Sequence, residues 1–393
     1  MRWAALRQGI RDMRFENIYG RHLCGELTQS QAGELLGVGE RTFRRWSARY
    51  REEGEDGLRD RRIGSAAANR VPDVLSARVE ALYRERFRGF TAKHFHEHLA
   101  RTAWFELSYT WTKLFLQSRG LLEVAPRRGA HRRKRPRRPV PGMMLHQDAS
   151  RHVWVAGVPA CDLVVTLDDA TSAIYSVILV PEEGTASTFA GLLETFGDHG
   201  LPCSLYTDRG SHYFHTPVVG GRVSRTVQTQ VGRALAQLGV DHIAAYSPEA
   251  RGRSERAFRT LQDRLPKELV LAGIVTVAAA NAWLRAVYVP QHNARFAVAA
   301  EQPGSAFVPV PGADLREALC HEEMRPVGQD NTVVLARVRL QIPASPLRAH
   351  YVRARVKVRR YADGGHGVFH GPRCIGRYDA AGIELAVAMQ QAD

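Results

Sequence analysis

The sequence has 393 residues and a formal net charge of +15 at pH 7. Because 44% of the residues are hydrophobic and 8% are aromatic, general disorder is excluded, and the length predicts about two to four packed domains. The excess of Lys and Arg calls for a polyanion, and nucleic acid is the commonest such partner for a protein without a membrane anchor.

No stretch is apolar over the length of a membrane span, and residues 1–10 lack the apolar core of a signal peptide. We therefore expect a cytoplasmic protein with no membrane partner. The cysteines are odd in number and far apart, which excludes a disulfide framework and a CxxC zinc site. They are predicted to be reduced, mostly buried thiols: Cys24, Cys161, Cys203, Cys320 and Cys374.

Residues 1–70 are predicted to form a helix-turn-helix DNA-binding domain. Thr28 and Gln31 have the spacing of a capping box, and Gly-Val-Gly at 37–39 favours a tight turn before a helix that begins at Glu40. The apolar face of the helix before the turn is predicted to consist of Ala32, Leu35 and Leu36.

The helix that begins at Glu40 has two contrasting faces. Its aromatic face consists of Phe43, Trp46 and Tyr50, and its opposite face carries Arg41, Arg44 and Arg45. A recognition helix needs this arrangement, because the aromatic rings anchor it while the arginines contact base edges and phosphates. The alternative is a basic, solvated surface helix, which the glycine turn disfavours.

A second helix-turn-helix or winged-helix domain is predicted over residues 71–125. Thr91 can cap a helix that buries Phe95 and Leu99. Ser108 can cap a second helix, which carries Trp111, Leu114 and Phe115 and has an exposed face of Tyr109, Thr110 and Lys113. His94, His96 and His98 resemble metal ligands. Residues two apart on a helix point in different directions, however, so we expect ordinary surface or capping histidines.

Residues 126–141 form a predicted basic linker that is rich in proline and arginine. Such a composition cannot bury a core and favours an extended backbone that can follow phosphates. Its DNA-binding candidates are Arg132, Arg133, Lys134 and Arg135.

Strands alternating with helices predict an α/β core over residues 142–300. A strand at 144–148 ends in Asp148, and residues 153–155 are its expected partner. Further strands are expected at 163–167, 174–180 and 203–206, the last of them followed by Asp208, with a helix at 186–196. A later helix carries Glu255 and Arg259, and its inner stripe consists of Phe258, Leu261 and Leu265.

Three clustered acids suit phosphodiester chemistry, which needs two divalent ions roughly 4 Å apart, held by oxygen ligands. The segments His146-Gln147-Asp148, Thr207-Asp208-Arg209-Gly210 and Ser247 to Arg256, in that order, resemble the three motifs of DDE transposases and retroviral integrases. The closer resemblance is to bacterial insertion-sequence transposases with an RNase H-like integrase core, including the ISNCY group.

This resemblance implies that Asp148, Asp208 and Glu255 are the catalytic, metal-binding triad for two Mg²⁺ or Mn²⁺ ions. It implies cleavage of transposon ends and joining of the 3′-OH to target DNA, with double-stranded DNA as partner, a homo-oligomer on the DNA, and a bacterial, nucleoid-associated location. The alternatives are a non-catalytic DNA-binding protein and an RNase H-like nuclease that cuts without joining. The three acids disfavour the first, and the basic terminal modules disfavour the second.

Other acids compete with this triad. Asp168 and Asp169 follow a strand but have the pattern of a turn, and Glu249 lies in the loop before the Glu255 helix as the second choice for the third acid. Ala149 stands where relatives often have glycine, and the Asp208 to Glu255 interval is longer than in retroviral integrases.

Residues 301–393 are predicted to form a small C-terminal DNA-binding β-barrel. Residues 351–359 alternate between apolar and basic side chains, and residues 362–365 favour a hairpin turn. The expected phosphate contacts are Arg353, Arg355 and Lys357, together with Arg359, and Arg259 adds one from the core. The alternative is a structural appendix with a solvated basic edge. The predicted fold class is thus multidomain: all-α helix-turn-helix modules, an α/β RNase H-like core and a β-barrel.

Overall fold

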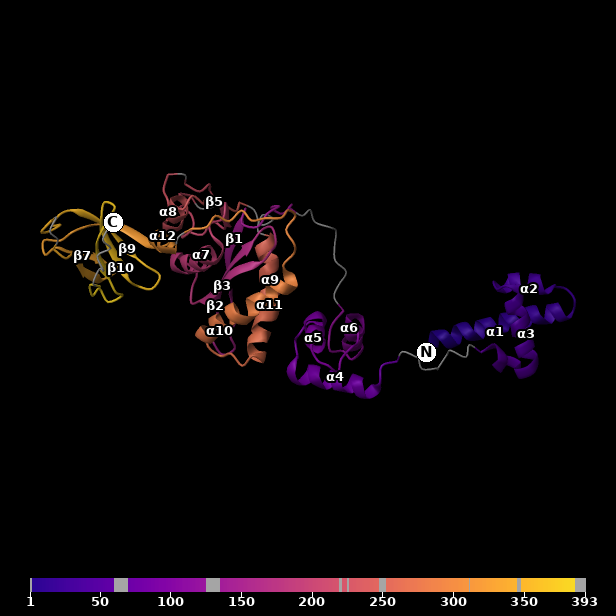
Figure 1. Cartoon of the computed structure of the whole chain (residues 1–393). Helices are drawn as coiled ribbons and strands as arrows, with labels where there is room; N and C mark the ends of the chain where they lie inside the picture. Colours follow the sequence, from indigo (N-terminus) through magenta and orange to yellow (C-terminus); the bar gives the residue numbers. More distant parts are fainter. Residues whose placement is uncertain are drawn as a thin grey trace. The chain divides into compact units, whose positions relative to one another are not determined.

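The computed structural model (Figure 1) describes residues 2–59, 70–124, 135–218, 221–224, 226–246, 252–310, 312–344 and 348–385. Side chains are described from residue 12 onward within these ranges, except at 312–314. The chain divides into two compact units, Met1–Glu85 and Arg86–Asp393. No helix in these described ranges is both long and apolar enough to cross a membrane.

The first unit is helical. It contains α1 (Arg2–Leu23), α2 (Gln29–Leu36), α3 (Glu40–Glu53), the 3-10 helix η1 (Gly54–Leu58) and most of α4 (Asp73–Arg86). Phe15, Ala32 and Phe43 are fully buried where the first three helices meet. This arrangement matches the predicted helix-turn-helix, except that Leu35 is 47% exposed rather than part of the apolar face.

The predicted signals around the turn are confirmed. The Thr28 backbone N–H donates to Gln31 Oε1 at 2.9 Å, and the Gln31 N–H donates to Thr28 Oγ1 at 3.2 Å, which completes the capping box. Gly37 ends α2 with φ +70°, a conformation that favours glycine. The turn therefore starts α3 at Glu40, as predicted.

The second unit opens with α5 (Ala92–Leu99) and α6 (Tyr109–Ser118). Thr91 and Ser108 cap these helices as predicted, by accepting from the N–H groups of His94 and Trp111. On α6, however, Thr112 and Leu116 are buried and Leu114 is 58% exposed, so the predicted apolar face is partly wrong.

The core sheet has the strand order β3-β2-β1-β4-β5. Its strands are β1 (Leu145–His152), β2 (Cys161–Asp168), β3 (Ile174–Val180), β4 (Ser204–Thr207) and β5 (Asp241–Ala244). The first three are antiparallel, whereas β4 is parallel to both β1 and β5. The expected strand at 153–155 is wrong, because β1 pairs with β2 along its whole length and Trp154 is buried instead.

Helices cover both faces of this sheet (Figure 1). On one face, β2 and β3 pack against α9 (Gly252–Leu271), α10 (Val277–Trp283) and the π-helical η3 (Leu284–Tyr288), which continues into α11 (Val289–Phe296). On the other face, β1 and β4 pack against α7 (Thr185–His199), α8 (Gln230–Gln237) and α12 (Gly312–Ala318). The predicted inner stripe of α9 is confirmed, because Phe258, Leu261 and Leu265 are buried.

The C-terminal strands form two sheets. The first has the order β11-β10-β9-β6, from β6 (His321–Pro326), β9 (Arg355–Arg360), β10 (His366–His370) and β11 (Arg373–Tyr378). The second pairs β7 (Thr332–Leu335) with β8 (Val338–Gln341). The hairpin at 362–365 is confirmed, with Gly364 at φ +84°. The barrel is not confirmed, because the described strands form open sheets, and β9 begins only after Arg353, whose φ of +63° is not extended.

All five cysteines are free thiols. Cys161 and Cys320 are buried, as predicted, and Cys374 is intermediate. Cys24 and Cys203 are exposed, so the prediction of burial is wrong for these two.

Candidate active site

Asp148 lies within β1, and Asp208 is the first residue after β4, the parallel neighbour of β1. In the β1–β4 register, Leu145 is opposite Leu205 and His146 is opposite Tyr206. Asp148 and Asp208 are each two residues further along, so both acids follow the paired residues of these two strands by the same number of positions. The sequence analysis predicted that this strand ends in Asp148. That bound is wrong, because the pairing of β1 with β2 continues to His152 and Asp148 lies inside the strand.

Backbone N–H groups orient both carboxylates. Asp148 Oδ1 accepts from the N–H of Ala149 at 3.0 Å, and Asp208 Oδ1 accepts from the N–H of Gly210 at 2.8 Å. Asp148 is buried, whereas Asp208 is partly exposed. Neighbouring carboxylates supply the hard oxygen ligands that Mg²⁺ and Mn²⁺ prefer, so the residues present suit such an ion.

Tyr213 lies within the electrostatic reach of both aspartates. Its hydroxyl lies 3.3 Å from Gln147 Oε1 and 3.3 Å from Glu183 Oε1. Burial raises the pKa of Tyr213, and the negative charges of Glu183 and of the two aspartates raise it further. The phenol therefore stays protonated and serves as a donor beside the acids. The sequence analysis did not single out Tyr213 or Glu183.

Glu255 lies in the first turn of α9, with an exposed side chain. Helix α9 packs beside β1, where Gln262 Nε2 donates to Ser150 Oγ at 2.8 Å. Among the described residues, Asp148, Asp208 and Glu255 are not a set whose ligand atoms all lie within 4.8 Å of one another. The structure thus places both aspartates near Tyr213 and the glutamate on the helix that packs beside β1. Glu249 lies outside the described residues.

Asp169 connects the segments that carry these acids. It is fully buried and accepts from His146 Nε2 at 2.7 Å and from the Arg138 N–H at 2.8 Å. It also forms ion pairs with Arg135 and Arg253. His146 precedes Asp148 by two residues and Arg253 precedes Glu255 by two, so Asp169 links β1 to the start of α9.

Burial by itself would raise the pKa of Asp169. The hydrogen bonds from His146 and the Arg138 N–H, together with the charge of Arg253, outweigh burial and hold that pKa well below its ordinary value. Asp169 is therefore ionised and binds several segments at once, whereas the sequence analysis predicted only a residue of the turn. Asp168 does play that turn role, since it accepts from the Thr171 N–H at 2.7 Å and from the Gly142 N–H at 3.0 Å.

The DNA-binding candidates of the helical modules are on the surface. Arg41, Arg44 and Arg45 are exposed on α3, and Arg44 Nη2 lies 2.6 Å from Glu40 Oε1. Lys113 on α6 and Arg259 on α9 are also exposed. The linker candidates Arg132, Arg133 and Lys134 lie outside the described residues, and Arg135 is paired with Asp169.

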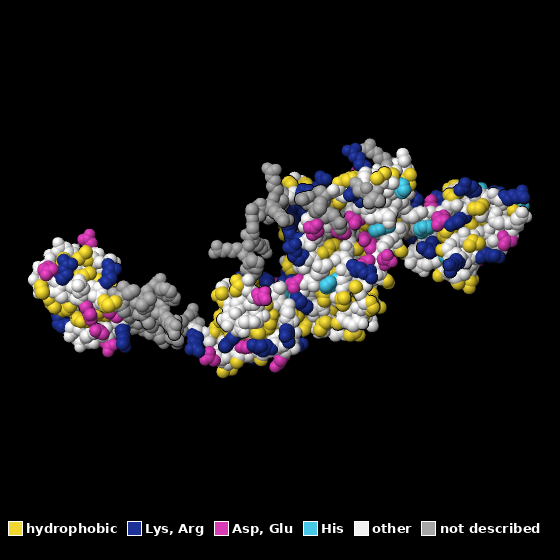
Figure 2. Space-filling model, turned by 180° about the vertical axis from the view of Figure 1, so that it is seen from behind, with side chains coloured by type: hydrophobic (Ala, Val, Ile, Leu, Met, Phe, Trp, Pro, Cys, Tyr) yellow, Lys and Arg dark blue, Asp and Glu magenta, His cyan; other side chains and the backbone are white. Residues whose placement is uncertain are grey.

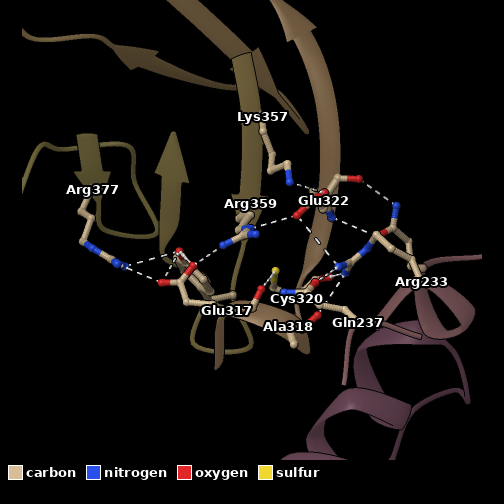
Figure 3. Close-up of polar contacts among 11 residues, drawn as sticks. Arg233, Gln237, Glu317, Ala318, Cys320, Glu322, Lys357, Arg359 and Arg377 are labelled. Atoms are coloured by element: carbon tan, nitrogen blue, oxygen red, sulfur yellow. Dashed lines mark hydrogen bonds and ion pairs between the residues drawn. The ribbon is translucent and has the colours of Figure 1, made fainter. Parts of the chain in front are cut away.

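The basic face of β9 is only partly available. The C-terminal strands, at the right in Figure 2, carry many surface Lys and Arg side chains, and Arg353 and Arg355 are exposed. In contrast, Lys357 Nζ lies 3.1 Å from Glu322 Oε1, and Arg359 Nε donates to Glu322 Oε2 at 2.9 Å (Figure 3). The antiparallel register places Glu322 opposite Arg359, so β6 neutralises part of the predicted phosphate track.

The prediction that the α5 histidines are ordinary surface or capping residues is wrong for His94, which is fully buried. His94 Nε2 lies 2.6 Å from Glu268 Oε1, and His98 Nε2 lies 2.9 Å from the same oxygen. His96 faces elsewhere, with Nδ1 3.1 Å from Thr112 Oγ1. A separation of four residues, rather than two, brings helical side chains together, which the sequence analysis overlooked.

Comparisons with known proteins support the first helical module and relate the chain to transposases. A family model described as a winged helix-turn helix matches residues 20–74. The protein y4bF of Sinorhizobium fredii, which is named as a putative transposase, is 31% identical over 360 residues, covering 90% of this chain and 78% of its own. The transposase for insertion sequence IS1202 of Streptococcus pneumoniae is 25% identical over 69% of this chain and 65% of its own length.

A solved structure of the HTLV-2 integrase catalytic core domain in complex with magnesium is also similar, at 17% sequence identity. It covers 37% of this chain and 86% of its own. The TM-score of 0.29 is too low to establish a shared fold.

Proposed function

Because this chain belongs to the family of insertion-sequence transposases, we propose that it cleaves transposon ends and joins the freed 3′-OH to target DNA. The observation that supports the proposal is the parallel register of β1 and β4, because Asp148 and Asp208 each follow the paired residues of these strands by two positions. Glu255 on α9 is the proposed third acid. The resemblance of the three motifs supports our assignment of the chain to the DDE transposases with an RNase H-like core, and the resemblance along the rest of the chain favours the ISNCY group.

Both reactions are in-line displacements at phosphorus, so one site can serve cleavage and joining in turn. Asp148, Asp208 and Glu255 would hold two Mg²⁺ or Mn²⁺ ions, which activate the attacking oxygen and stabilise the leaving oxygen. The backbone N–H groups of Ala149 and Gly210 fix the two aspartate carboxylates before DNA arrives. We expect the protein to act on double-stranded DNA as a homo-oligomer.

The test uses the purified chain, duplexes that carry the inverted repeats flanking its gene, and a supercoiled target plasmid. Products joined at the 3′ end of the transposon are expected. Cleavage without joining would indicate a nuclease, and end binding without cleavage would indicate a non-catalytic DNA-binding protein. Either result would overturn the proposal.

Cleavage and joining should depend absolutely on a divalent cation, because clustered carboxylates repel one another until a cation neutralises them. Mg²⁺ or Mn²⁺ should support both steps, and excess EDTA should remove them while leaving end binding in place. Gel assays of both products with and without EDTA measure this. Undiminished activity in EDTA would exclude the two-metal site.

Arg44→Ala and Arg45→Ala should reduce the preference for transposon ends over scrambled DNA. An arginine contact with a guanine edge contributes roughly 1–3 kcal/mol of discrimination. Binding titrations on both duplexes measure the change. Equal loss on both duplexes would mean that α3 is an electrostatic anchor and that end recognition lies elsewhere, with residues 72–124 the next candidates.

Arg353→Ala and Arg355→Ala provide the matched comparison. Phosphate contacts carry no sequence information, so these variants should weaken binding to both duplexes alike. The plot of the logarithm of the binding constant against the logarithm of the salt concentration should also become less steep, by about one unit of slope for each lost contact.

A further inference from the structure

The carboxylate of Glu268, near the end of α9, lacks a permanent cationic partner among the described residues. Its side chain is 16% exposed, and its hydrogen-bond partners are the imidazoles of His94 and His98. The neighbouring cations are paired with other acids. Lys267 Nζ lies 2.6 Å from Asp263 Oδ1, and Arg264 Nη1 lies 2.6 Å from Glu97 Oε2. A largely buried carboxylate with two imidazole partners therefore faces the interface between α5 and α9.

The carboxylate of Glu268 is largely withdrawn from water, because its side chain is only 16% exposed. Buried charges are generally either paired or bound to metal ions, so the charge of Glu268 favours a bound cation.

The geometry matches a three-ligand site. His94 and His98 are one helical turn apart on α5, and both direct Nε2 toward the same oxygen of Glu268. All three ligand atoms lie within 4.8 Å of one another, the one such group found among the described residues. Phe90 stacks on the His94 ring with centroids 4.4 Å apart, and Phe87 lies 5.1 Å from the His98 ring, so aromatic side chains hold both imidazoles in place.

We propose that His94, His98 and Glu268 bind a divalent transition-metal ion, best matched by Zn²⁺, that fastens α5 to α9. Two imidazole nitrogens and one carboxylate oxygen are a ligand set that zinc accepts, with its remaining position open to water. His98 and Glu268 are each 16% exposed, so solvent reaches that position. Nitrogen ligands disfavour Mg²⁺, and the site therefore differs in metal preference from the aspartate pair on β1 and β4.

The site is separate from the proposed catalytic centre. Glu268 and Glu255 lie on the same helix, and at about 1.5 Å of rise for each residue they are roughly 20 Å apart along its axis. The ion would anchor a helix of the second predicted DNA-binding module to the helix that carries the third proposed acid. The proposal rests on the ligand geometry alone, and it stands whether or not the protein joins DNA ends.

The test is zinc binding by the full chain after chelator treatment, measured by titration calorimetry in excess Mg²⁺ to occupy the carboxylate site. Wild type should bind about one zinc ion that His98→Ala and Glu268→Gln do not bind. His96→Ala is the matched control, because His96 lies on the same helix but contacts Thr112, and it should bind zinc like wild type. Loss of a ligand should weaken binding by more than the 10–100-fold that loss of an outer-shell partner costs.

Two further readouts keep the result independent of folding defects. Co²⁺ in place of zinc should give visible absorption bands that disappear in His98→Ala, and zinc should raise the melting temperature of wild type and His96→Ala but not of His98→Ala. His98 is partly exposed, so its alanine variant should fold even if Glu268→Gln does not. Equal zinc binding by wild type and His98→Ala, with no effect of zinc on either melting temperature, would overturn the proposal.

Discussion

Asp208→Asn should abolish end cleavage and strand transfer while leaving end binding nearly unchanged. The amide keeps the shape of the side chain but removes the negative charge that would hold a divalent ion. Because such an ion supplies several kcal/mol of transition-state stabilisation, a loss of about 10³-fold or more in rate is expected. Asp148→Asn should behave alike, since Asp148 is the other aspartate of the proposed metal site. Rates of end cleavage, with binding measured in parallel, check this.

Neighbouring acids provide the controls for this prediction. Asp168→Asn should retain substantial activity, because the Asp168 carboxylate is used by the turn and by the Gly142 N–H. Glu255→Gln should be inactive, whereas Glu249→Gln should be active. The opposite result for the two glutamates would move the third acid to Glu249.

The parts of the fold that the sequence predicted well depend on neighbours along the chain. The capping box spans Thr28 to Gln31, and the two faces of α3 follow from helical periodicity alone. The inner stripe of α9 and the hairpin at 362–365 have the same local origin. These features can be predicted from sequence because each depends on residues that are close together along the chain.

The features that were missed join residues that are distant in sequence. Glu268 lies 174 residues from His94, so nothing near the histidines indicates that one of them is buried against a carboxylate. Glu322 lies on a separate strand from Lys357, so the alternation along β9 does not reveal that the acids of β6 pair with its basic side chains. The partner of β1 was misassigned for the same reason, because a short apolar run nearby in sequence was preferred to β2.

Asp169 is the residue whose role the sequence analysis most underestimated, because hydrogen-bond donors from three segments meet at its carboxylate. Arg135 comes from the segment before the core, His146 from β1 and Arg253 from α9. Removal of one partner from a buried ion pair leaves the other charge uncompensated. In this site the uncompensated groups would include Arg253, whose side chain is 11% exposed.

Asp169→Asn should therefore lower the free energy of unfolding by about 3–5 kcal/mol, measured by urea denaturation near neutral pH. Arg151→Ala is the control on the same sheet, because its ion pair with Asp162 involves a side chain that is 60% exposed, and it should cost less than about 1 kcal/mol. The folded-state pKa of Asp169 is lowered, so its contribution is fully present above the ordinary Asp value of about 3.9 and is lost as the pH falls below it. The difference between wild type and Asp169→Asn should accordingly shrink in acid. A loss no larger than that of Arg151→Ala would mean that Asp169 does not hold β1 and α9 together.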